Sequence, residues 1–302
     1  MPRLISCDDD QSAGLSEVLA QLDSRPFCCT DEDSLTNAAL ALRRLYNDRD
    51  FLGDMLVAQL ADADRNETQG DNGYGPQSIM LSGVRNGYFL RANIWPSERD
   101  EIYASSGART FVYGVPHDHN FSFLTIGYFG PGYRSAYYEY EYTDTVGFVG
   151  ERPGLRFVEQ SALDEGKMQL YRAHLDIHDQ IPPETMSVSL NVIQADEVSG
   201  WFDQYGFDLE SEAITGLINP NAAETFLRIA VGLGGAEAQD LAERFGRSHP
   251  SDRIRLASYE ARAALCTTSA GRDALWCEAE RRSGSVRVQR VASLRRRALE
   301  AV

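Results

Sequence analysis

Four of the five histidines fall in two short stretches of the sequence, and imidazole is a good ligand for transition metals. His117 and His119 lie two residues apart in PHDHN, and His174 and His178 lie four apart in AHLDIHD. Because residues i and i+2 of a strand point to the same face, the first pair is expected to direct two imidazoles toward one point. A third imidazole from a neighbouring strand would complete a metal site.

The second histidine pair offers two candidates for the third ligand. Residues 170–173 have the composition of a strand, whereas residues 179–183 have the composition of a turn. We therefore expect His174 to bind the metal. His178 is then expected to act beside the metal, as a hydrogen-bonding partner or proton shuttle.

The region 80–195 resembles the cupin superfamily, and its first motif is similar to that of cysteine dioxygenase and related thiol dioxygenases. The motif HDHNFSFL, residues 117–124, carries this resemblance, together with the later strand MSVSLNV, residues 186–192. The resemblance implies an antiparallel double-stranded β-helix in which His117, His119 and His174 hold Fe(II), with other divalent transition metals also suited to three imidazoles. Asn191 stands where those enzymes have a catalytic histidine.

A fourth protein ligand is less clear from the sequence. The usual cupin glutamate position falls on Leu124 or Thr125, which cannot ligate as a carboxylate. If residues 121–129 and 133–142 form a hairpin, Glu139 and Glu141 would share the face of the histidines. A one-residue bulge would reverse this and turn the neighbouring tyrosines inward.

Arginines and tyrosines near the motifs are candidates for substrate binding and catalysis. Arg134 and Arg172 are the cations nearest the histidines in the sequence, and a guanidinium suits a carboxylate. Tyr113, Tyr128 and Tyr171 could line the cavity and donate hydrogen bonds, although each also fits a structural role.

The predicted elements change along the chain from helical to β and back to helical, which indicates an α+β fold. Helical spacing in residues 13–62 gives way to short β-prone runs, and helical spacing returns beyond residue 206. We predict an N-terminal helical segment (1–75) packed on a cupin-type antiparallel β-barrel (76–206), followed by a C-terminal helical domain (207–302). Candidate strands are 78–84, 88–95, 111–115, 121–129, 136–142, 147–148, 155–159, 168–174 and 186–193.

The C-terminal helical region has a loose internal repeat. Helix starts recur near residues 219, 249 and 283, each with Pro, Asp or Ser-Gly before a run of arginines and small apolar residues. This pattern resembles HEAT-like helical repeats. An ordinary helical bundle is the alternative, and either could bind a protein partner.

Charge and the scarcity of lysine disfavour several function classes. The formal net charge is −16, so nucleic-acid binding is disfavoured. Lys167 is the only lysine, which disfavours Schiff-base and P-loop chemistry. Residues 244–302 nevertheless hold 13 arginines against 6 acidic residues, so this part is basic and either pairs within the chain or binds an acidic partner.

The sequence favours a cytoplasmic protein without membrane segments. Residues 1–14 lack the apolar stretch of a secretory signal, and no window of about 18 uncharged apolar residues occurs. The five cysteines show no CxxC spacing, so neither a disulfide framework nor a zinc ribbon is indicated.

These features together predict a mononuclear non-haem iron(II) oxygenase of cupin type. Its expected reactants are dioxygen and a small amino-acid-like or thiol substrate, or a peptide, that carries a carboxylate or thiol. The alternative is a non-catalytic cupin sensor whose C-terminal helices recruit a protein partner.

Overall fold

The computed structural model describes residues 2–63, 77–196 and 198–300, and it separates into two compact units. The first unit comprises residues 1–143 and 153–212, and the second comprises residues 144–152 and 213–302. We call them the N-terminal and C-terminal units. The predicted division into three parts, with boundaries at 75 and 206, stays a prediction.

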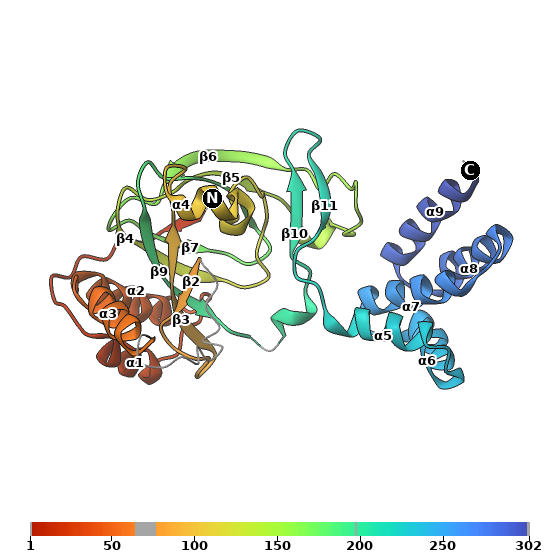
Figure 1. Ribbon diagram of the computed structural model, residues 1–302, viewed down its shortest axis with the longest axis horizontal. Coiled ribbons are helices and arrows are strands. Elements are labelled where there is room, and N and C mark those ends of the chain that lie inside the picture. Colours follow the sequence, from red (N-terminus) through yellow and green to blue (C-terminus); the bar gives the residue numbers. More distant parts are fainter. Residues whose placement is uncertain (1, 64–76, 197, 301–302) are drawn as a thin grey trace. The chain divides into compact units, whose positions relative to one another are not determined.

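Two antiparallel sheets form the body of the N-terminal unit (Figure 1). The larger sheet has the strand order β1-β7-β4-β9-β3-β2, and the smaller has the order β6-β5-β8. The larger sheet is built from β1 (Arg3–Leu4), β2 (Ser78–Met80), β3 (Tyr88–Trp95), β4 (Phe123–Phe129), β7 (Met168–Tyr171) and β9 (Ser187–Gln194). The smaller sheet is built from β5 (Arg134–Glu139), β6 (Arg156–Ala162) and β8 (Asp176–Ile181), and β10 (Tyr205–Asp208) follows them in the chain.

The chain passes repeatedly between the two sheets. From β4 in the larger sheet it crosses to β5 and β6, returns as β7, crosses again as β8 and returns as β9. Such alternation wraps two antiparallel sheets around one interior, which is the cupin-type double-stranded β-helix. The predicted α+β fold with a cupin-type barrel is therefore confirmed.

The predicted hairpin between the fourth and fifth strands is wrong. β4 pairs with β7 and β9, whereas β5 pairs with β6 and β8, so the two strands belong to different sheets. Gly130 and Gly132 have φ of +79° and +74°, a region that glycine enters without a Cβ penalty. The Gly-Pro-Gly segment is thus a corner that carries the chain from one sheet to the other.

Replacing Gly132 should measure how tightly this corner is packed. A Cβ at Gly132 would collide with the carbonyl oxygen of Leu163, in addition to the cost of the positive φ. Gly154 also has a positive φ, but a Cβ there would meet nothing within 4 Å. We expect Gly132→Ala to cost about 3 kcal/mol and Gly154→Ala about 1 kcal/mol of unfolding free energy in denaturant titration. Equal losses would contradict a close approach at this corner.

The larger sheet has one aliphatic face and one face that mixes polar and aromatic residues. Its aliphatic face packs on α1 (Leu15–Ser24), α2 (Glu32–Asn47) and α3 (Phe51–Ala63), which gather beside it in Figure 1. Because side chains alternate along a strand, the residues between the apolar ones face the barrel interior. The residues of β3, β4, β7 and β9 that pack in this helix-covered core are Leu90, Ala92, Leu124, Ile126, Met168, Leu170, Leu190 and Val192.

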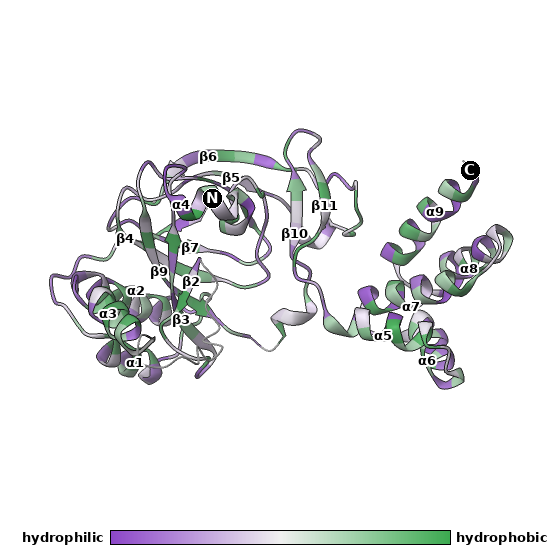
Figure 2. Cartoon of the chain, in the orientation of Figure 1, coloured by the Kyte–Doolittle hydropathy of each residue, from purple (hydrophilic) through white to green (hydrophobic). Residues whose placement is uncertain are grey.

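The C-terminal unit is mainly helical. Its helices are α5 (Ala222–Gly232), α6 (Ala236–Ser248), α7 (Asp252–Leu265), α8 (Ser269–Arg282) and α9 (Val286–Glu300), preceded by β11 (Ala213–Leu217). Hydrophobic and hydrophilic residues are interspersed along them (Figure 2), and α7 packs on both α5 and α6. The starts of α5, α7 and α9 follow the predicted recurrence, while the likeness to HEAT repeats stays a prediction. Within the described ranges, no helix has the length and apolar character needed to cross a membrane.

Many arginines of the C-terminal unit pair with acids of the same unit. Arg247 contacts Glu243 and Glu278, and Arg296 contacts Asp273 and Glu280. The unit therefore neutralises part of its own basic charge, and a protein partner for it stays a prediction.

Candidate metal centre

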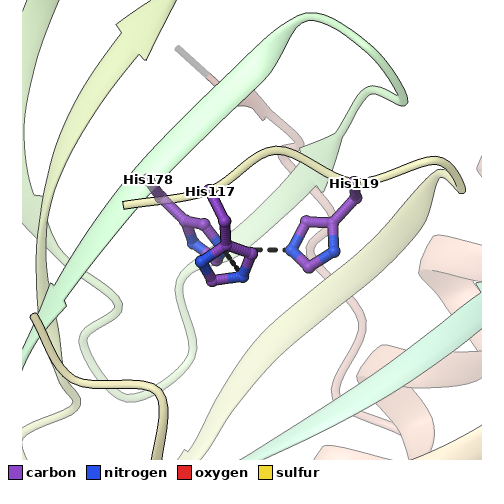
Figure 3. A group of neighbouring side chains, drawn as sticks. All are labelled: His117, His119 and His178. Atoms are coloured by element: carbon purple, nitrogen blue, oxygen red, sulfur yellow. Dashed lines mark hydrogen bonds between the residues drawn. The ribbon is translucent and has the colours of Figure 1, made fainter. Parts of the chain in front are cut away.

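Three buried imidazoles face one another inside the barrel of the N-terminal unit (Figure 3). The Nε2 atom of His178 lies 3.0 Å from that of His119 and 3.1 Å from that of His117. The three side chains come from two elements, since His117 and His119 precede β4 and His178 lies in β8. Their ligand atoms all lie within 4.8 Å of one another.

Backbone hydrogen bonds fix the segment that carries the first two histidines. His117 N donates to His178 O at 3.1 Å, and His178 N donates back to His117 O at 3.0 Å. On the other side, Phe207 N of β10 donates to Pro116 O at 2.9 Å. The segment is thus held between β8 and β10, which keeps the imidazoles in place without a metal.

Asp118, between the two histidines, holds the segment rather than the metal. Its Oδ1 accepts a hydrogen bond from Tyr205 N and its Oδ2 accepts one from the Tyr140 hydroxyl, both at 2.6 Å. Burial raises the pKa of this carboxyl to about 7. A polar group buried in this way needs such partners, and here they tie the histidine segment to β10.

The environment keeps the three imidazoles neutral. Burial lowers the pKa of His117 to about 4 and holds the pKa values of His119 and His178 well below the usual range. The Nδ1–H of His117 donates to Val115 O at 2.6 Å, which leaves the lone pair on Nε2, the nitrogen that faces His178. Neutral imidazole is the form that binds a metal, so the site needs no proton release to accept one at neutral pH.

The nitrogen spacing fits a divalent transition metal. Two imidazole nitrogens at about 2.1 Å from one ion lie about 3.0 Å apart when the angle at the ion is 90°, and about 3.4 Å apart at the tetrahedral angle. The separations of 3.0 and 3.1 Å match the first case. His117, His119 and His178 would hold such an ion, and three protein ligands would leave further coordination positions for a substrate and dioxygen.

The structure corrects the expected third ligand. His174 has a left-handed backbone with φ of 61°, and its ring packs on Tyr142 and Phe202 at the edge of a surface pocket. His178 instead joins the pair, because β8 spans Asp176–Ile181 and so continues into the residues 179–183 that were expected to form a turn. A role of His178 as a metal ligand would replace the expected role beside the metal.

Two tyrosines expected to line the cavity have their hydroxyls engaged elsewhere. The Tyr113 hydroxyl donates to Pro96 O at 2.9 Å, and its ring packs on Trp95. Tyr128 lies on the helix-facing side of β4, where its hydroxyl donates to the carbonyl oxygens of Asp48 and Arg49. Strand alternation places Tyr128 on the helix-covered side of the sheet, not in the barrel interior with the histidines.

The expected charged residues do not reach the histidines either. Arg134 is exposed on β5, and Arg172 pairs with Asp176 at 2.7 Å and with Glu139 at 3.0 Å. Glu139 also pairs with Arg156, while Glu141 is exposed. Because the hairpin that would have turned Glu139 and Glu141 toward the metal does not form, neither glutamate is a ligand in this geometry.

A partly buried arginine that the sequence did not reveal as a candidate lies on the inner face of β3. Arg91 alternates with Leu90 and Ala92 of the helix-covered core and shares its face with Phe89, which packs in the inner aromatic cluster. Burial lowers the pKa of Arg91 to about 10, and its Nε is buried with no hydrogen-bond partner. The alternation along the predicted strand 88–95 was the signal that could have identified it.

Three tyrosine hydroxyls also meet inside the barrel. The Tyr171 hydroxyl lies 3.2 Å from that of Tyr133 and 3.0 Å from that of Tyr137. The Tyr171 ring lies 5.0 Å from the His178 ring, centroid to centroid. Of the tyrosines considered from the sequence, Tyr171 is therefore the one placed beside the histidines.

Comparisons with known proteins give distant structural likenesses. No family model matches the sequence, and no curated protein matches it. Similar solved structures include hydroquinone 1,2-dioxygenase from Sphingomonas sp. TTNP3 with 4-hydroxybenzoate bound, at 11% identity and a TM-score of 0.26, covering 41% of this chain and 68% of that chain. A cupin-like protein from Thermotoga maritima has 9% identity and a TM-score of 0.25, covering 45% of this chain and 80% of that one.

The DMSP lyase DddQ from Ruegeria pomeroyi has 10% identity and a TM-score of 0.23, covering 65% of this chain and 79% of that one. Likeness at this level leaves the reaction and substrate of this chain to be inferred from its own residues. The resemblance to thiol dioxygenases stays a prediction.

Proposed function

We propose that the protein is a mononuclear non-haem iron(II) oxygenase that acts on a small molecule carrying a carboxylate. The observation that carries the proposal is the group of three buried, neutral imidazoles whose Nε2 atoms face one point. His117, His119 and His178 would hold the ion. Ferrous iron would supply the one-electron chemistry that allows dioxygen to react with a closed-shell organic substrate.

The interior beside the histidines is built to bind a polar ligand. Cross-strand pairing places Arg91, Asn191, Thr125 and Gln169 in one row across β3, β9, β4 and β7. Arg91 Nε, Thr125 Oγ1 and Gln169 Nε2 are buried without hydrogen-bond partners among the described residues. Unpaired buried polar atoms are costly, so a row of them supports a ligand that supplies their partners.

Arg91 favours an anionic ligand. A guanidinium binds a carboxylate through paired hydrogen bonds, and burial strengthens that interaction. The Tyr133, Tyr137 and Tyr171 hydroxyls offer further donors near His178. In this arrangement Arg91 holds the carboxylate while the histidine centre faces the reacting end of the substrate, which fits amino-acid-like or thiol acids.

Oxygen consumption tests this proposal. The full chain is loaded anaerobically with ferrous iron, desalted, and given small carboxylates, including thiol and amino acids, next to the matching amides. We expect oxygen uptake with at least one acid and at least 100-fold less with its amide, because the amide lacks the negative charge and the second accepting oxygen that pair with Arg91. Iron-loaded protein that binds acids without consuming oxygen would contradict an oxygenase and support the sensor alternative.

A further inference from the structure

Gln180 lies beside the three histidines of the candidate metal centre. It follows His178 by two residues in β8, so the two side chains share the inner face, and only 4% of Gln180 is exposed. Its Nε2 lies 3.3 Å from His178 Nε2, and its Oε1 is buried with no hydrogen-bond partner.

The side-chain amide of Gln180 has two orientations of similar shape. A 180° rotation exchanges its oxygen and nitrogen, and only the hydrogen-bond network distinguishes them. Gln180 Nε2 lies within hydrogen-bond distance of His178 Nε2, and the direction of that bond depends on the histidine tautomer. An ion held by His178 Nε2 would leave this nitrogen neither a proton nor a lone pair for the amide N–H, so the amide oxygen becomes the group suited to face the ion.

We propose that Gln180 is the fourth protein ligand of this metal centre, binding a divalent transition ion through its amide oxygen. The inference rests on the proposed three-histidine site and extends it. The separation of 3.3 Å from His178 Nε2 lies between the values of about 3.0 and 3.4 Å for two ligand atoms of one ion at 90° and at the tetrahedral angle. Amide oxygen is an accepted ligand type beside imidazole for such ions.

No carboxylate competes with Gln180 for this position in the part of the chain that the structure describes. The metal-ligating group found there contains three histidines and no acid. Asp118 is engaged by Tyr205 N and Tyr140, and Glu139 is engaged by two arginines.

A neutral set of three imidazoles and one amide leaves the full charge of a divalent ion in the site. That charge, together with Arg91, favours an anionic ligand in the positions that remain open. The fourth ligand would thereby contribute to the preference for acids over neutral molecules.

Cobalt(II) binding tests the assignment without relying on activity. Cobalt(II) is titrated into metal-free full-length protein, and its visible absorption reports both affinity and coordination. We expect Gln180→Ala to weaken binding about 10- to 100-fold and to change the intensity of the visible bands. Gln180→Glu keeps the shape and supplies an anionic oxygen, so it should bind cobalt(II) at least 10-fold more tightly than the wild type.

Asn93→Asp is the matched control. Asn93 is a buried amide on the inner face of β3, and its Oδ1 accepts a hydrogen bond from the Ser78 hydroxyl at 2.9 Å. A carboxylate at Asn93 should leave the cobalt spectrum unchanged. Equal gains at Asn93 and Gln180 would overturn direct ligation, because they would show a general effect of added negative charge.

The possible outcomes distinguish failure of the Gln180 proposal from failure of the three-histidine proposal. Wild-type affinity and an unchanged spectrum in Gln180→Glu would overturn Gln180 as a ligand while leaving the three-histidine centre intact. A wild-type chain that binds no cobalt(II) would overturn both proposals. If Gln180→Ala does not fold, Gln180→Glu with its control still decides the question.

Discussion

His178→Ala should lose ferrous iron binding, whereas His174→Ala should retain it. The two histidines lie four residues apart, but only His178 faces His117 and His119, at 3.1 and 3.0 Å between Nε2 atoms. Structural four-ligand zinc sites gain roughly 10–16 kcal/mol on binding, so one ligand contributes about 3–4 kcal/mol. The expected loss in His178→Ala is therefore about 100- to 1,000-fold in affinity.

Competition titration of ferrous iron against a chromogenic chelator under anaerobic conditions measures this difference. His174→Ala serves as the control, since it removes an imidazole from the same stretch of chain. Both variants should unfold cooperatively, because the backbone bonds between residues 117 and 178 do not involve the side chains. A larger loss of affinity in His174→Ala than in His178→Ala would contradict the ligand assignment.

Arg91→Met should abolish discrimination in favour of acids and leave the fold at least as stable. The Nε of Arg91 is buried without a hydrogen-bond partner, so the guanidinium costs stability in the protein without ligand. Methionine has a similar unbranched stem and no charge to bury. We expect a gain of about 1–3 kcal/mol in stability and a loss of at least 100-fold in affinity for carboxylates.

Thermal unfolding with and without a small acid checks both parts of this expectation. The wild-type melting temperature should rise when the acid is added, and that of Arg91→Met should be higher at the start but unresponsive to the acid. Arg172→Met is the control, because it leaves the fully buried side chain of Asp176 without its guanidinium partner and should cost about 3 kcal/mol. Destabilisation by Arg91→Met together with retained ligand response would contradict a ligand-binding role.

The sequence alone was sufficient to predict the β-barrel and two of the three imidazoles of the candidate metal centre. Alternation and β-branched or aromatic residues identify β3 and β9 closely, and the His-x-His spacing is visible without a structure. These features can be recognised from local sequence. The third histidine cannot be identified in this way, because its position depends on which strand lies next to residue 117.

The misassignment of β8 has a specific physical cause. Its sequence DIHDQI places Asp176, His178 and Gln180 on the inner face, so the interior side of the strand is polar. Prediction of a strand from alternating apolar and polar residues assumes an apolar interior. Pro182 and Pro183, just beyond the strand, also favour a turn. The alternation rule failed for β8 because the barrel interior that this strand faces holds the polar residues of the candidate metal centre.

The hairpin error has a different origin. Gly-Pro-Gly between two β-prone runs is typical of a hairpin, and local sequence does not show whether the following strand returns to the same sheet. Gly132 packs closely against Leu163, about thirty residues later in the chain, and this contact accompanies the corner between the two sheets. Such a long-range contact leaves no local signal.

Crystallographic anomalous scattering at the iron edge, from protein loaded anaerobically with ferrous iron, tests the central claim most directly. The proposed centre predicts one strong peak per chain, bounded by the Nε2 atoms of His117, His119 and His178. A peak beside His174, a peak bounded by carboxylates elsewhere, or no ordered iron at the three imidazoles would contradict it.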